Sequence, residues 1–233
     1  LNEPVVNAAV GAWGSDQIVL HAEHMSELLR PRLVIISFLW HDIQRADYDI
    51  YIGSHKPYFT IEEDELVHRN YPVPIFDGNA TEIGWARASL GYSYLVTWMM
   101  QRIGYQQWLV PWDAQYRKTH PDGTGTEISC RLLERFKQRA DRKNFRFVFL
   151  MQYGSGDFVQ DSPPAQAAAV SGCAANDSEI DVVDPWIVMK GIHDSDLPHF
   201  QGLFVLQADN KTLGHMSRAG NELMARELLR VIR

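Results

Sequence analysis

The sequence predicts an α/β domain built on a largely parallel sheet. Short runs rich in β-branched and aromatic residues alternate with segments of helical periodicity along the chain. Two of the short runs are continuously apolar, as expected of strands that are buried on both faces of a parallel sheet. They are residues 32–40, "RLVIISFLW", and residues 145–154, "FRFVFLMQYG".

The N-terminal part of the chain reads as strand, helix, strand. We expect the first strand over residues 3–11, "EPVVNAAVG", and a helix within residues 15–32, where apolar residues recur at helical spacing. Ser15 or Asp16 is the expected N-cap, and Pro31 lies beyond the last helical residue. Residues 43–80 form an irregular insertion, rich in proline and aromatic residues, which we expect to shape a pocket.

The remainder of the chain continues the alternation. Helices are expected over residues 84–104, 123–144, 162–177 and 216–233, a strand over 179–186 and a short extended segment over 202–209. No internal repeat or clear linker separates these segments. We therefore expect a single domain that spans residues 1–233.

Composition excludes several classes of function. A net charge of −7 argues against a nucleic-acid partner, which would need a basic face. No apolar run is long enough for a transmembrane segment. Cys130 and Cys173 are expected to be free thiols, with a single bridge between them as the alternative. The compartment stays unassigned, export being one option, and so does the oligomeric state.

Cofactor and metal sites are not expected. No phosphate-cradling glycine loop opens a helix, which argues against a nucleotide enzyme. The segment "HDSDLPH", residues 193–199, has residue types that bind metals but lacks the spacing of a structural zinc site. We therefore predict no cofactor and no metal.

His215 is the strongest candidate for chemistry. A histidine transfers protons near neutral pH with little tuning, although a lone histidine before a helix is more often a turn residue. Its segment, "HMSRAGNELMA", resembles the C-terminal block of the SGNH (GDSL-type) ester hydrolase superfamily. Residues 5–17, "VVNAAVGAWGSDQ", and 32–46, "RLVIISFLWHDIQRA", are similar to the second and third blocks of that superfamily, in the same order.

The resemblance implies a fold and a mechanism. The fold would be a three-layer α/β/α sandwich of the SGNH or flavodoxin-like kind, and the substrate a small-molecule, carbohydrate or lipid ester. A serine nucleophile needs a base and the base an orienting acid, while the oxyanion needs hydrogen-bond donors. His215 would be the base and Asp209 its orienting acid, and the oxyanion donors would be the Ala12 N–H and His41.

Four positions depart from the family pattern. No Gly-Asp-Ser sequence occurs, so the nucleophilic serine would have to lie upstream of Leu1. Ala12 replaces a glycine, and His41, which alternatively caps the strand end, replaces an asparagine. The acid of the family pattern would fall at Thr212 or Leu213, and neither residue is acidic. The candidate acids are therefore Asp209, which is alternatively a turn residue, and Asp184. The alternative function is therefore an inactive binding or scaffolding domain of the same fold.

Overall fold

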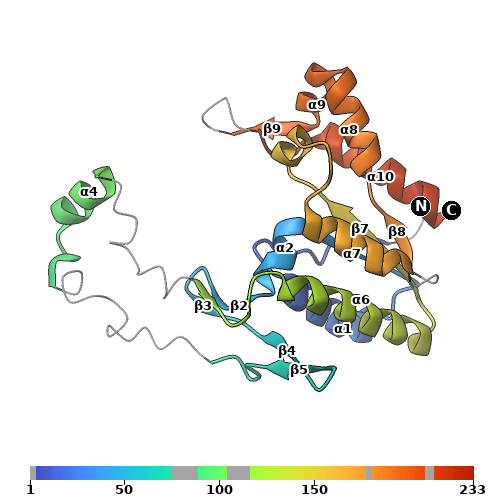
Figure 1. Cartoon of the computed structure of the whole chain (residues 1–233), viewed down its shortest axis with the longest axis horizontal. Coiled ribbons are helices and arrows are strands. Elements are labelled where there is room, and N and C mark those ends of the chain that lie inside the picture. Colours follow the sequence, from blue (N-terminus) through green and yellow to red (C-terminus); the bar gives the residue numbers. More distant parts are fainter. Residues whose placement is uncertain (1–3, 75–88, 104–115, 177–179, 208–212) are drawn as a thin grey trace.

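A parallel three-stranded sheet lies at the centre of the protein, in a computed structural model that describes residues 4–74, 89–103, 116–176, 180–207 and 213–233 (Figure 1). Its strand order is β1-β7-β8. The strands are β1 (Leu33–Leu39), β7 (Arg146–Gln152) and β8 (Asp181–Val183), and Leu33 of β1 lies opposite Arg146 of β7. The predicted α/β class with a parallel central sheet is confirmed.

Helices cover both faces of the central strand. Phe147, Phe149 and Met151 of β7 belong to the main core, together with residues of three helices on that face. Val148 and Leu150 point to the other face, where they cluster with apolar residues of the C-terminal helix. The helices of the first face are α1 (Ser15–Leu29), α6 (Thr124–Lys143) and α7 (Ala165–Asn176), and the C-terminal helix is α10 (Arg218–Ile232).

Strand β1 is covered less completely than its sequence predicts. Ile36 and Phe38 are buried in the main core, but Ile35, on the opposite face, is 41% exposed. Within the described residues, β1 pairs only with β7 and its second edge has no partner strand. The prediction that this strand is buried on both faces is therefore wrong for one face.

The strand expected over residues 3–11 is not present in its described part. Residues 4–10 have no assigned strand or helix, and Val5 and Val6 are 81% and 59% exposed. A strand needs backbone partners on a neighbouring strand, and this segment pairs with none in the described part of the chain. The apolar pattern alone could not supply that partner.

Helix α1 begins earlier than either expected N-cap, Ser15 or Asp16, implies. Its N-cap is Gly14, whereas Ser15 and Asp16 are buried in the first helical turn. Ser15 Oγ hydrogen-bonds to Ser129 Oγ of α6 at 2.7 Å, so its hydroxyl joins two helices instead of capping one. The helix ends at Leu29, and Arg30 takes the left-handed conformation (φ 46°) that often follows a helix.

Antiparallel strands occupy much of the segment 43–80. After the short helix α2 (Trp40–Arg45), β2 (Tyr48–Tyr51) pairs with β3 (Ser54–His55) on one side and with β6 (Tyr116–Lys118) on the other. β4 (Tyr58–Glu62) and β5 (Glu65–Arg69) form a separate hairpin.

Helix α4 (Tyr94–Arg102), within the helix expected over 84–104, stands apart from the central sheet in Figure 1. Its apolar side chains include Leu95, 64% exposed, and Met99, 53% exposed. Among the helices in the described ranges, none combines the length and apolar character that crossing a membrane requires.

The C-terminal third adds elements at the carboxyl end of β7 and β8. They are the 3-10 helix η3 (Ser155–Val159), α8 (Trp186–Ser195), α9 (Leu197–Gly202), β9 (Phe204–Leu206) and β10 (Leu213–Met216). Aromatic side chains join them: Phe158 of η3 stacks on Trp186 at 4.8 Å between ring centroids and meets Phe200 edge-on at 5.3 Å. The predicted closing helix is confirmed as α10, whereas α8 and α9 were not predicted.

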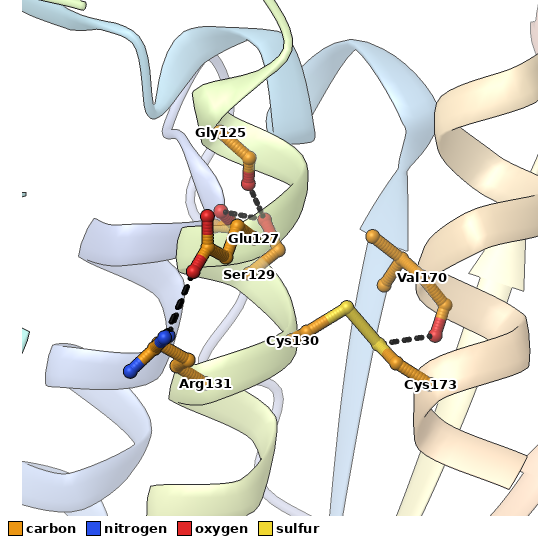
Figure 2. The surroundings of a disulfide bond; sticks show 8 residues. Gly125, Glu127, Ser129, Cys130, Arg131, Val170 and Cys173 are labelled. Atoms are coloured by element: carbon orange, nitrogen blue, oxygen red, sulfur yellow. Dashed lines mark hydrogen bonds and ion pairs between the residues drawn. A yellow bond between two sulfur atoms is a disulfide. The ribbon is translucent and has the colours of Figure 1, made fainter. Parts of the chain in front are cut away.

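The two cysteines form a disulfide, which corrects the expectation of free thiols. Figure 2 shows Cys130 on α6 and Cys173 on α7, with their sulfur atoms bonded between the two helices. Their Cα atoms lie 5.9 Å apart, within the normal range for a bridge. The spacing of 43 residues along the sequence carries no information about this distance.

Candidate functional site

The carboxyl ends of the parallel strands bring several polar residues to one edge of the sheet. His41 follows β1 directly, Ser155 and Asp157 follow β7, and Asp184 follows β8. In open α/β folds this edge is where loops build binding and catalytic sites. This edge of the sheet is therefore the place of the candidate site.

His41 lies on α2, with its ring against that of Trp40 at 3.8 Å between centroids. Partial burial lowers the pKa of His41, the charge of Arg45 lowers it further, and the carboxylate of Asp157 opposes both. The imidazole is therefore neutral at pH 7 and has one N–H to donate. A neutral donor suits the role expected from the sequence, stabilisation of an oxyanion.

The turn that contains Ala12 is held against α2. Arg45 Nη1 donates a hydrogen bond to the Trp13 carbonyl oxygen at 3.3 Å and pairs with Asp42 at 2.5 Å. A Cβ atom on Gly14 would lie 3.1 Å from the backbone of Arg45, so only glycine permits this approach without adjustment. Ala12 itself has φ 67°, a left-handed conformation that favours glycine. The turn of Ala12 and the helix of His41 are thus brought together.

His215 lies in strand β10, not in the loop that the sequence predicted. β10 pairs antiparallel with β9, and the His215 side chain is exposed. Ser155 Oγ donates a hydrogen bond to the Leu213 carbonyl oxygen at 3.2 Å, which ties β10 to η3. Because Asp157 of the same η3 acts on His41, this short helix connects the surroundings of His41 and His215.

The other polar residues of the segment 215–225 build the corner between β10 and α10. Ser217 Oγ donates to the Gly202 carbonyl at 2.7 Å and accepts the Gly220 N–H at 3.3 Å as the N-cap. Asn221 Nδ2 donates to the Ser217 carbonyl at 2.9 Å. A Cβ atom on Gly220 would lie only 2.2 Å from the Leu203 carbonyl oxygen, which explains the glycine. Among the described residues, no hydrogen bond or ion pair is formed by the His215 side chain.

Of the two candidate acids, Asp209 and Asp184, only Asp184 lies within the described residues. Asp209 lies outside the described residues. Asp184 accepts hydrogen bonds from Tyr153 Oη at 2.9 and 3.0 Å, from Ser171 Oγ at 2.8 Å and from the Trp186 N–H at 3.0 Å. Burial raises the pKa of Tyr153, and the Asp184 carboxylate adds to this effect, so Tyr153 remains a donor. Asp184 thus joins the end of β7 to α7 and α8, and no hydrogen bond or ion pair connects it to His215.

A pocket of about 240 Å³ opens beside the turn of Ala12. One wall is the turn and the start of α1, and the other is the hairpin of β2 and β3. Lys56 of the hairpin and Asp16 of α1 form a buried ion pair that joins the two walls. Neither His41 nor His215 lines the pocket. Its lining residues are Gly11, Ala12, Trp13, Gln17, Tyr51, Ile52, Ser54, His55 and Lys56.

Sequence reasoning missed the contribution of Asp16 and Lys56. Asp16 was expected as a cap, and Lys56 was one charged residue within the insertion. The two positions are 40 residues apart and follow no motif, so no sequence signal announced the pair. Five of the pocket residues, Tyr51, Ile52, Ser54, His55 and Lys56, belong to the segment 43–80.

The histidines of the segment 193–199 contribute to local structure. His193 Nδ1 lies 2.8 Å from Asp194 Oδ1, and the His199 N–H donates to Asp196 Oδ1 at 3.0 Å, which caps α9. Within the described ranges, no group of three or more histidine, cysteine or acidic residues is arranged to hold a metal ion.

Comparison of this chain with protein-family models, with curated proteins and with solved structures finds no match. The geometry of the sheet edge therefore carries the functional argument.

Proposed function

We propose that this chain belongs to an SGNH-type ester hydrolase in which His215 is the general base. One observation carries the proposal. In the segment 215–225, Ser217, Gly220 and Asn221 all have structural roles, whereas the exposed His215 side chain bonds to no described residue. Such a histidine, held on a strand tied to η3, is free to contact a substrate.

The proposed mechanism assigns a role to each candidate. A serine upstream of Leu1 attacks the ester carbonyl, and His215 takes the serine proton and later returns it to the leaving alcohol. The backbone N–H of Ala12 and the neutral ring of His41 donate hydrogen bonds to the oxyanion. Asp209 orients His215. The contact of Arg45 with the Trp13 carbonyl supports the pairing of the two donors, because it holds their segments side by side.

We propose further that the complete fold is the three-layer α/β/α sandwich of this superfamily. An additional strand beside β1 is supported by the edge of β1 that pairs with no described strand, and by the exposed side chains of Ile35, Val5 and Val6. Such a strand would end at the same edge of the sheet as His41. A serine in the loop that follows it would then lie near the oxyanion donors.

An inactive binding domain is the second candidate, and one observation favours it. Asp184, the candidate acid that lies within the described residues, is engaged by Tyr153, Ser171 and Trp186. A base without an orienting acid loses most of its advantage.

The proposal is tested by the hydrolysis of p-nitrophenyl acetate by the full-length protein. We expect the His215→Ala variant to lose about a hundred- to ten-thousandfold in kcat/KM. The His41→Ala variant should lose about a hundred- to a thousandfold. His24→Ala, which removes an exposed histidine of α1, is the matched control and should be unchanged. Equal rates for His215→Ala and the unaltered protein would exclude the mechanism and favour the binding domain.

A further inference from the structure

The pocket between the turn of Ala12 and the β2–β3 hairpin has a wall chemistry that selects its ligand. Trp13 and Tyr51 supply aromatic surface, while Gln17, Ser54 and Lys56 supply polar groups. Mixed aromatic and polar linings bind ligands that have both apolar faces and hydrogen-bonding groups. Ala12, proposed as an oxyanion donor, belongs to the same lining.

Two polar side chains of the lining, Gln17 and Lys56, have N–H bonds left to donate. Gln17 Oε1 already accepts the Gly14 N–H at 3.3 Å, which leaves the two N–H bonds of its amide. Lys56 Nζ donates to Asp16 Oδ2 and to the Pro57 carbonyl, which leaves one of its three N–H bonds. Ser54 is exposed at the rim of the hairpin. The pocket therefore offers hydrogen bonds to ligand oxygen atoms.

The charge of the pocket argues against an ionic ligand. Among the described residues that line the pocket, Lys56 alone has a permanent charge. Its side chain is 3% exposed and paired with Asp16, which is fully buried. The pair is neutral as a unit, and no carboxylate belongs to the lining. An anion would have to compete with Asp16 for Lys56, and a cation would find no counter-ion.

The size of the pocket limits the size of the ligand. About 240 Å³ is below the range of about 300–1,000 Å³ that is typical of drug-sized ligands. A ring with several hydroxyl groups fits this space, whereas a long acyl chain does not.

We infer that this pocket binds the alcohol part of the ester, and that this part is an uncharged polyhydroxylated ring of about the size of one sugar unit. The inference rests on the proposed ester hydrolysis only where it identifies the bound group as the alcohol of an ester. The binding itself needs no nucleophile. Trp13 and Tyr51 would contact the apolar edges of the ring, and Gln17, Ser54 and Lys56 would donate to its oxygen atoms.

The test is a titration of the full-length protein with methyl β-D-glucopyranoside, followed by the NMR signal of the Ala12 backbone N–H, which lies in the pocket lining and is kept in every variant below. We expect a saturable shift with a Kd of the order of 1 mM, the affinity of a few hydrogen bonds and one ring contact. Trp13→Phe, which preserves an aromatic wall, should bind similarly. Gln17→Leu should weaken binding about tenfold, while Trp98→Ala on the distant α4 is the matched control.

Sodium hexanoate, an acyl-chain probe, should cause no saturable shift at the same concentrations. Absence of a saturable shift with the glucoside would overturn the inference, as would equal affinity in Gln17→Leu. The two proposals fail separately. Turnover of p-nitrophenyl acetate without glucoside binding would overturn the sugar-binding inference and leave the hydrolase proposal in place. Glucoside binding without any turnover would overturn the hydrolase proposal and leave the inference in place.

Discussion

Lys56 and Asp16 form an ion pair in which both side chains are shielded from water, with exposed fractions of 3% and 0%. The pair joins the β2–β3 hairpin to the first turn of α1, across the pocket. Burial raises the pKa of Asp16, and the neighbouring Lys56 ammonium opposes this effect. Asp16 therefore depends on Lys56 to carry its charge inside the protein.

Breaking this pair from one side should be costly. Lys56→Met or Asp16→Asn leaves a buried partner uncompensated, so we expect each to reduce the free energy of unfolding by about 3–5 kcal/mol. The double variant should lose less than the sum of the two, because no uncompensated charge remains. Urea unfolding of the four proteins measures this coupling. Additive losses would show that the two side chains do not interact.

Asp42 should make stability depend on pH. Burial raises its pKa to about 6, although the Leu39 N–H and Arg45 both act to lower it. Because the folded state binds this proton more tightly than the unfolded state, the contribution is fully present below about pH 4 and is lost as the pH rises through about 6. We expect a loss of about 3 kcal/mol across this interval, since one pKa unit corresponds to about 1.4 kcal/mol.

The Asp42→Asn variant isolates this contribution, because its amide oxygen can still accept the Leu39 N–H. Denaturant unfolding of both proteins at several pH values gives the difference. The unaltered protein should lose stability relative to Asp42→Asn between about pH 4 and pH 7. Parallel pH profiles would contradict the prediction.

The disulfide should contribute substantially to stability. It closes a loop with a sequence separation of 43 residues, for which the loss of chain entropy in the unfolded state corresponds to about 4 kcal/mol. We expect Cys130→Ser/Cys173→Ser to show a lowered melting temperature and insensitivity to dithiothreitol. The unaltered protein should fall to the same melting temperature only after reduction. A double variant as stable as the oxidised protein would mean that the bridge adds nothing.

Ala12→Gly should stabilise the protein. Ala12 has φ 67°, where an L-residue with a Cβ atom is strained by about 1–2 kcal/mol and glycine is not. Glycine also increases the conformational entropy of the unfolded chain, which offsets part of this stabilisation. We therefore expect the free energy of unfolding to increase by about 0.5–1 kcal/mol. Thermal unfolding measures it, with Ala8→Gly in the irregular N-terminal segment as the control. A lower stability of Ala12→Gly would show that the turn is not held in this conformation.

Sequence reasoning succeeded where local pattern and tertiary surroundings agree. Phe147, Phe149 and Met151 form one face of a run that is apolar on both faces, and β7 is indeed covered on both. The run at β1 has the same pattern, but α10 covers mainly the neighbouring strands and Ile35 stays exposed. The apolar pattern of a strand shows which of its faces are apolar, but it does not show which elements pack on those faces.

The hairpin of β4 and β5 was missed for a different reason. Glu63 and Asp64 occupy its turn with φ 49° and 70°, a conformation usually marked by asparagine and glycine. The candidate site was predictable as three separated blocks, and their assembly depended on contacts such as that of Arg45 with the Trp13 carbonyl. No spacing in the sequence encodes such a contact.

The parallel pairing of β1 with β7 has a consequence for the order of folding. Gln152 Nε2 donates to Ser37 Oγ at 2.6 Å across these strands, from a position 115 residues away in the chain. Parallel contacts between such distant segments form slowly, because the entropy of a large loop is lost before the contact is gained. The helices α6 and α7 are far closer in sequence, so the bridge between them can close while the sheet is still incomplete.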